Sequence, residues 1–247
     1  MPPHREAPVA PLAVAVGGGL LFAGSLVGFV WNLRPGGSLA VDAGAWTSAG
    51  WRAIAADVAL FTLFALHHSM FARLGLKAWV THRLPAGLER PAYVWVSSVL
   101  FALTWWWWQP VPGRLWTVTG PAAAIASAVA WMGVVVTLVA AGRLSVFDLS
   151  GLTQVLDAHR PPAAQHDAPL VTGGLYGLVR HPIYLGWVLI VWGSPEMTGT
   201  RAAFAAISTA YLMAAIPFEE RGLTAAFGPA YAAYRVRVRW RMLPFIY

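Results

Sequence analysis

Long uncharged runs of apolar residues constrain this chain more than any other feature. From Val9 to Leu33 there is no Asp, Glu, Lys or Arg, and only 11% of the whole chain is charged, against about 25% in a typical soluble domain. A membrane-spanning helix needs about 20 mostly apolar residues. Similar runs follow at Ile54–Ala72, Ala92–Trp108, Thr117–Ala141, Ile183–Pro195 and Ala202–Phe218. The sequence therefore predicts an all-α integral membrane protein with about five to six transmembrane helices.

The fifth run, Ile183–Pro195, is too short to cross the bilayer by itself. At about 1.5 Å per residue it falls well short of an apolar layer about 30 Å thick. The Gly- and Pro-containing segment Gly193–Thr200 separates it from the sixth run. We therefore expect these two runs to form a C-terminal helical hairpin.

The basic residues predict the orientation in the membrane. If the N-terminus is cytoplasmic, most of the 17 lysines and arginines fall on the inner side, as the positive-inside rule requires. The exceptions are Arg34, Arg52, Arg114 and Arg201. We expect both termini in the cytoplasm and an amphipathic cytoplasmic tail whose arginines, Arg235 to Arg241, contact lipid. The net charge of +7 is then explained by orientation and anionic lipid, and no nucleic-acid partner is expected.

Residue types that are absent or scattered exclude several classes of site. The chain has no cysteine, which excludes disulfides, thiolate metal sites and cysteine nucleophiles. The seven histidines are dispersed, with His67–His68 the only adjacent pair, so no metal is expected. Trp105 to Trp108 are typical of an aromatic belt at the outer interface.

The polar residues gather in the last third of the chain. We predict one membrane domain, residues 1–247, in which 1–144 form a transmembrane scaffold and 145–247 carry the chemistry. A loop of about 40 residues precedes the fifth run, and loops of that length are uncommon without a function. It ends in "VTGGLYGLVRHP".

Arg180, His181 and Pro182 stand at the start of the fifth run, and Tyr184 and Gly186 follow. Pro182 suits a first helical turn, where its missing N–H costs nothing. Free backbone N–H groups there, together with Arg180, suit a carboxylate. Tyr184 follows Arg180 by four residues, so the two can share one helix face. The alternative is a simple positive-inside anchor at a helix end.

A second polar group, Glu219–Glu220, lies at the inner end of the sixth run, where its alternative is a solvated helix end. Pro229, after Gly228, starts a further basic helix on which Tyr231 and Tyr234 are expected to face the core. A hairpin brings both polar groups to one membrane face. Two cations and two carboxylates then flank one pocket.

These residues resemble the signature of the isoprenylcysteine carboxyl methyltransferase superfamily of integral membrane methyltransferases. The signature is Arg-His-Pro-x-Tyr-x-Gly, then a hairpin, then Glu-Glu, then Phe-Gly-x-x-Tyr-x-x-Tyr. It is matched by Arg180–Gly186, Glu219–Glu220 and Phe227–Tyr234. Three segments are similar to the branch of bacterial methanethiol S-methyltransferases: Phe64 to Pro112, "FDLSGLTQV" and "IYLGWVLIVWGSPEMT".

The resemblance implies S-adenosylmethionine as cofactor and a protein of the bacterial inner membrane. It implies that the acceptor is methanethiol or another small thiol, with dimethyl sulfide as product. The expected cofactor-binding residues are Val171, Gly174, Leu175, Tyr176, His181, Pro182, Tyr184, Gly186 and Glu220. Arg180 and Glu219 are expected to act directly in catalysis.

His68 completes the expected catalytic set. A thiol attacks as its thiolate, so a nearby base favours the reaction, and His68 lies near the inner end of the second run. It is equally open to a purely structural hydrogen bond. Two other functions stay open: methylation of an isoprenylcysteine-like or other lipid-borne acceptor, and a non-enzymatic haem-binding membrane protein that uses His68 and His181.

Overall fold

The structure is a computed structural model that describes residues 9–33, 50–71, 83–85, 87–144, 147, 150–158 and 169–247. Several basic residues used to predict the orientation lie outside the described residues. These are Arg5, Arg34, Arg73, Lys77 and Arg160.

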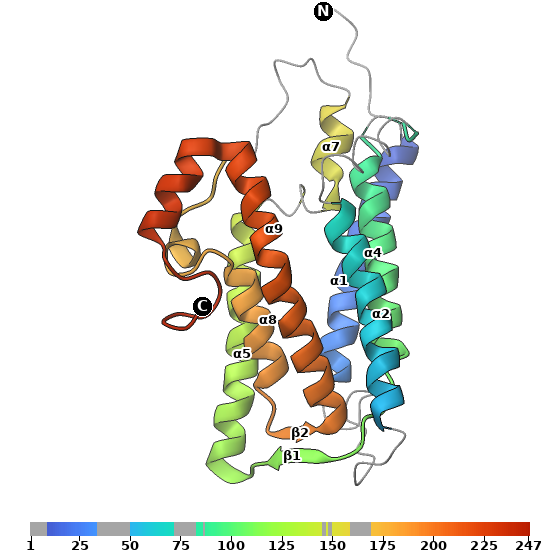
Figure 1. Ribbon diagram of the computed structural model, residues 1–247. Helices are drawn as coiled ribbons and strands as arrows, with labels where there is room; N and C mark the ends of the chain where they lie inside the picture. The colour runs from blue at the N-terminus through green and yellow to red at the C-terminus, as the bar shows by residue number, and fades with distance from the viewer. Residues whose placement is uncertain are drawn as a thin grey trace, which may run out of the picture. The chain divides into compact units, whose positions relative to one another are not determined.

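Six helices coincide with the six apolar runs (Figure 1). They are α1 (Val9–Asn32), α2 (Gly50–Phe71), α4 (Glu89–Trp106), α5 (Gly120–Arg143), α8 (Pro182–Trp192) and α9 (Gly199–Arg237). Among the described residues, α1, α5 and α9 are long and apolar enough to cross a membrane, and α8 is a shorter apolar helix. The protein is mostly helical, as its apolar patterning predicts.

The all-α expectation needs one correction, since two short strands pair in an antiparallel ribbon. β1 (Arg114–Thr117) and β2 (Glu196–Thr198) align Arg114 with Thr198. Met197 and Thr198 are fully buried, and buried backbone polar groups need hydrogen-bond partners. Pairing supplies those partners. Strands this short cannot show an alternating pattern in a sequence.

The long loop before α8 also contains regular structure. It includes the short helix α7 (Leu152–Asp157) and the 3₁₀ helix η3 (Gly174–Gly177). Of its polar residues, Asp148, His159, His166 and Asp167 lie outside the described residues.

The chain forms two compact units that interleave along the sequence. The first unit comprises α1, the C-terminal half of α2, α4 and α7. Within it, the indole Nε1 of Trp95 donates to the Val14 carbonyl at 2.9 Å. The glycines of α1 allow tryptophan rings of α4 to approach its backbone closely, since a Cβ added at Gly28 would lie 2.9 Å from the Trp105 ring. Small residues therefore set the contact between α1 and α4, as is common between membrane helices.

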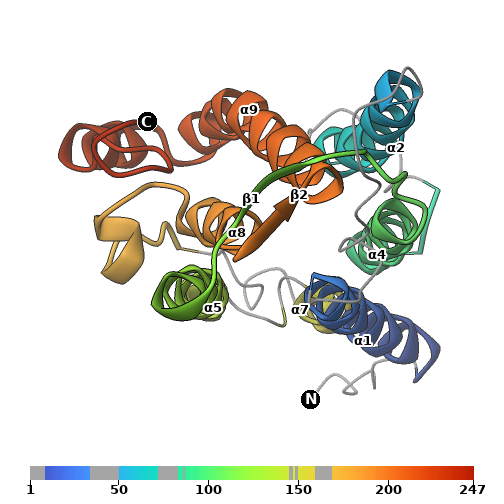
Figure 2. The ribbon, with the colours of Figure 1, turned by 90° about the horizontal axis from the view of Figure 1, so that it is seen from below.

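The second unit comprises the N-terminal half of α2, β1, α5, η3, α8, β2 and α9. Seen along the helices, α8 lies beside both α5 and α9 (Figure 2). A Cβ added at Gly186 would lie 2.2 Å from the Thr137 hydroxyl oxygen, and one at Gly193 would lie 2.5 Å from the Ala130 nitrogen. A glycine within α8 and another directly after it thus let the backbones of α5 and α8 approach closely.

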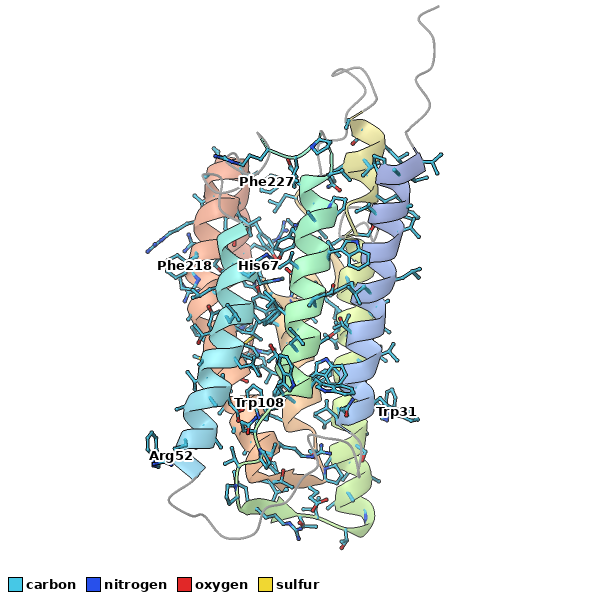
Figure 3. The ribbon with its side chains drawn as sticks, turned by 90° about the vertical axis from the view of Figure 1, so that its right-hand side faces the viewer. Trp31, Arg52, His67, Trp108, Phe218 and Phe227 are labelled. Atoms are coloured by element: carbon cyan, nitrogen blue, oxygen red, sulfur yellow. The ribbon has the colours of Figure 1, made fainter. Side chains whose placement is uncertain are left out.

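The expected belt of four tryptophans divides into buried and exposed side chains. Trp105 and Trp108 are each 7% exposed, whereas Trp106 and Trp107 are largely exposed. Trp108, labelled in Figure 3, belongs to the second unit, where its ring packs edge-on against Phe204 at 4.8 Å between centroids. The run therefore contributes to the protein core as well as to its surface.

The helix that starts at Gly199 breaks at Gly228, whose φ of 49° lies in the left-handed region that favours glycine. Beyond the break the second part of α9 bends back from the first (Figure 1). Tyr231 and Tyr234 are buried there, at 1% and 4% exposure, which confirms that they face the core. Phe218, before the break, projects outward from α9 (Figure 3) and is 53% exposed.

Residues 238–247, here termed the C-terminal strap, fold back onto α8 and α9. Met242 is fully buried and packs with Val188 of α8 and Ile216 of α9. The strap runs beside the segment that begins α8, and this proximity shapes the site.

Candidate functional site

The two polar groups singled out in the sequence meet in the second unit. The Arg180 Nε donates to Glu220 Oε1 at 2.7 Å, and these side chains are only 6% and 5% exposed. The expected contact between the start of α8 and the end of the apolar part of α9 is therefore observed. In a low-dielectric interior such a pair is retained only when further bonds satisfy both ions.

Backbone pairing with the strap fixes the segment before α8. The Arg180 and His181 N–H groups donate to the carbonyls of Trp240 and Arg241, at 2.9 and 2.7 Å. Pro182 then opens α8 at its first turn, as expected from its ring geometry. The strap thereby takes the N–H groups of the two residues that precede the first turn of α8.

The Arg180 guanidinium is engaged by the protein itself. Its Nη1 donates to the carbonyls of Val238 and Arg239, at 2.7 and 2.8 Å, in addition to the bond with Glu220. The whole residue is 8% exposed. Arg180 therefore ties α8, α9 and the strap together at one buried point.

His181 bridges the two glutamates. Its Nδ1 lies 3.3 Å from Glu219 Oε2 and its Nε2 lies 3.5 Å from Glu220 Oε1. Burial lowers the pKa of His181, but the contacts with Glu219 and Glu220 and their negative charges outweigh it and raise the pKa above its usual value of 6.5. The imidazolium form is thereby favoured in the folded protein.

Glu219 differs from Glu220 in its exposure. Its side chain is 41% exposed, against 5% for Glu220. The Tyr184 hydroxyl donates to Glu219 Oε1, and the Tyr184 ring stacks on His181 at 5.4 Å between centroids. The carboxylate of Glu219 is thus positioned by hydrogen bonding and accessible to solvent or a ligand, whereas the carboxylate of Glu220 is buried.

Two further arginines approach Glu220. The Nε atoms of Arg241 and Arg235 lie 3.6 and 3.9 Å from Glu220 Oε2. Sequence reasoning assigned these residues to lipid contact and missed their approach to the site. The alternating segment "RVRVRWRM" carries no signal for which arginine turns inward.

A cluster of tyrosines supports the site from the side of η3. The Tyr234 hydroxyl donates to the Tyr176 carbonyl at 2.7 Å. Burial, with a smaller contribution from the charge of Glu219, raises the pKa of Tyr176 to about 12. Tyr176 consequently stays protonated, and its hydroxyl donates to the Ala140 carbonyl at 3.4 Å.

Four other expected site residues fall into two groups. Val171, Gly174 and Leu175 lie in or just before η3 and are half-buried or exposed. Gly186 faces α5, where it serves helix packing.

His68 belongs to the first unit. Its Nδ1 is 2.8 Å from the Tyr93 hydroxyl, and its neighbour His67 places Nδ1 3.2 Å from the Ser97 hydroxyl (Figure 3 labels His67). The structure thus gives His68 a hydrogen-bond partner on α4. Its expected role as a base stays a prediction.

Comparison with known proteins identifies the class. Residues 124–230 match the family model described as "Phospholipid methyltransferase". This range includes most of α5, all of α8 and the part of α9 that carries both glutamates. The match covers less than half of the chain, and together with the apolar helices it indicates an integral membrane protein related to methyltransferases.

Individual relatives identify the family within this class. "Methanethiol S-methyltransferase 2" of Bradyrhizobium diazoefficiens is 38% identical over 212 residues, 86% of this chain and 80% of the relative. "Methanethiol S-methyltransferase" of Pseudomonas deceptionensis is 40% identical over 187 residues, 75% of this chain and 71% of the relative. The protein of that name in Mycobacterium tuberculosis is 38% identical over 193 residues, 76% of this chain and 77% of the relative. No solved structure matches the chain. The chain belongs to the methanethiol S-methyltransferase family.

Proposed function

We propose that this protein transfers a methyl group from S-adenosylmethionine to methanethiol or another small thiol, giving dimethyl sulfide from methanethiol. The observation that carries the proposal is the contact between Arg180–His181 and Glu219–Glu220 in a chain whose relatives bear the name methanethiol S-methyltransferase. The donor would supply an activated methyl group on a positively charged sulfur.

The chemistry of the side chains fits this donor. Its amino-acid end has an ammonium and a carboxylate, which need an anionic and a cationic partner. The half-exposed carboxylate of Glu219 suits the ammonium, and arginines surround the neighbouring Glu220. Val171, Gly174, Leu175 and Tyr176, which precede α8 in the chain, would line the donor. His181, Pro182 and Tyr184 would form the floor of the same site.

The protein would act mainly by positioning. Methyl transfer requires the nucleophile, the methyl carbon and the leaving sulfur in line, and good orientation can contribute about 7–11 kcal/mol. The contacts of Arg180 with α9 and the strap hold the donor side rigid. His68, hydrogen-bonded to Tyr93, is the proposed base that takes the thiol proton.

We further propose the membrane arrangement that the apolar runs and basic residues support. Five to six helices cross or enter the bilayer of a bacterial inner membrane, and α8 and α9 form the C-terminal hairpin. Both termini and the basic tail lie on the cytoplasmic side. In this arrangement residues 1–144 act as a scaffold and 145–247 form the catalytic half of a single membrane domain. A small apolar thiol would reach the site through lipid.

The decisive experiment offers purified protein labelled S-adenosylmethionine and a panel of acceptors. The panel contains methanethiol, ethanethiol, an isoprenylated cysteine and phosphatidylethanolamine, with headspace analysis for volatile sulfides. We expect labelled dimethyl sulfide from methanethiol and its loss in Glu219→Gln. Undiminished activity in both Glu219→Gln and Arg180→Ala would contradict the assignment of the site.

A lipid acceptor is the second candidate, because the matching family model is described as a phospholipid methyltransferase. The same panel separates the two. Labelled phosphatidylethanolamine or isoprenylated cysteine, without any labelled sulfide, would replace the thiol by a lipid-borne acceptor and leave the donor site unchanged.

A further inference from the structure

Among the residues that the structure describes, the positive charges at the site outnumber the negative ones. Three arginines, Arg180, Arg235 and Arg241, lie within 4 Å of Glu220, and Glu219 is the second carboxylate of the cluster. Three positive charges therefore meet two negative ones, and protonated His181 adds a fourth positive charge. A partly buried excess of positive charge attracts an anion. Such a cluster suits an anionic group of a ligand.

Arg180 is poorly placed to bind that anion. It is 8% exposed, and its Nε and Nη1 already donate to Glu220 and to two strap carbonyls. A ligand carboxylate would have to displace these bonds. The exposed arginines of the cluster are the better candidates.

Arg241 is held in position and still accessible. Its side chain is 32% exposed, and its Nη1 donates to the Tyr247 hydroxyl at 3.1 Å. Its guanidinium carbon also lies 5.2 Å from the centre of the Tyr247 ring. Within the described part of the chain its Nη2 has no hydrogen-bond partner. Arg235, by contrast, is 45% exposed, and its Nε approaches Glu220 only to 3.9 Å.

We propose that Arg241 binds the carboxylate of the methyl donor, while Arg180 is a positioning residue that holds the strap. The proposal rests on the proposed donor, S-adenosylmethionine. It assigns the carboxylate of the donor's amino-acid end to Arg241 and the ammonium to Glu219. The strap, which the sequence assigned to lipid contact, is then part of the ligand site.

Two ligands that differ only in the carboxylate test this assignment. S-adenosylhomocysteine carries it, and S-adenosyl-3-thiopropylamine lacks it. Titration calorimetry on the full chain gives both dissociation constants for wild type and Arg241→Met. A charge-assisted hydrogen bond predicts that Arg241→Met weakens S-adenosylhomocysteine binding by about 10- to 100-fold. Binding of the decarboxylated ligand should change by less than about twofold.

Arg237→Met is the matched control. Arg237 is an exposed arginine near the same end of the chain, and its described contact is with the Tyr234 ring at 5.9 Å. Arg237→Met removes the same charge as Arg241→Met and should leave both dissociation constants unchanged. If Arg237→Met weakened S-adenosylhomocysteine binding more than binding of the decarboxylated ligand, the effect would be one of net charge, and the proposal would be overturned.

The other outcomes are equally decisive. Equal weakening of both ligands by Arg241→Met, or no weakening, would overturn the assignment. An unchanged melting temperature of Arg241→Met excludes misfolding as the cause of a loss in binding. If the wild-type protein binds neither ligand, the proposed donor itself is wrong. Arg180→Met should weaken binding of the carboxylate-bearing ligand as well, because it releases the strap that carries Arg241, and it should also lower the melting temperature, which Arg241→Met should not.

Discussion

Replacement of Glu220 by glutamine isolates the buried ion pair. The substitution keeps the shape of the side chain and removes the charge that Arg180 contacts at 2.7 Å. Removing one partner of a buried pair typically costs about 3–5 kcal/mol, because the other charge stays buried and unpaired. The two strap carbonyls still accept from Arg180, which reduces the loss, whereas repulsion among the three arginines increases it.

A loss of about 3–5 kcal/mol corresponds to a fall in melting temperature of about 6–20 °C for a chain of this size. Tryptophan fluorescence on heating measures it, since the chain has 14 tryptophans. Glu219→Gln is the matched control at the adjacent position. Its side chain is 41% exposed, so solvent screening limits the loss to about 0–1 kcal/mol.

Comparing Glu220→Gln with Glu219→Gln separates an effect on stability from an effect on ligand binding. We expect Glu220→Gln to lower the melting temperature and Glu219→Gln to weaken donor binding at nearly normal stability. A double variant, Arg180→Met with Glu220→Met, should recover part of the loss because no charge is left unpaired. A melting temperature of Glu220→Gln within about 2 °C of wild type would refute the reasoning.

Three further predictions follow from the second unit. Gly186→Ala should cost about 1–3 kcal/mol because its Cβ would overlap α5, whereas Gly142→Ala, with nothing within 4 Å, should be neutral or stabilising. Met242→Ala should cost about 2–5 kcal/mol of stability because the side chain is fully buried. Its control is Phe245→Ala, since Phe245 is 84% exposed. Equal melting temperatures for the two alanine variants would contradict this prediction. The raised pKa of His181 means that its stabilisation is fully present below pH 6.5 and is lost as pH rises through the folded pKa. The difference in melting temperature between wild type and His181→Gln should therefore shrink from about pH 6 to about pH 9, and a constant difference would contradict it.

The sequence by itself determined the helical membrane class, the positions of the six main helices and the residues that meet at the site. Apolar runs report helices directly, because a bilayer leaves the backbone few alternatives. Gly228 followed by Pro229 also marked the break in α9, since each residue restricts the backbone locally. The arrangement Arg180–His181 and Glu219–Glu220 was predictable because a short run must pair with its neighbour.

Only the tertiary structure decided what these charged groups contact. Arg180 looks like a ligand-binding cation in the sequence, yet carbonyls of Val238 and Arg239 surround it. Every residue has the same backbone carbonyl, so no sequence pattern indicates that a distant segment will supply the hydrogen-bond acceptors of Arg180. The same holds for Arg241, whose approach to Glu220 depends on where the strap folds back. Helix positions follow from local residue patterns, whereas hydrogen-bond partners far apart in the chain follow from packing.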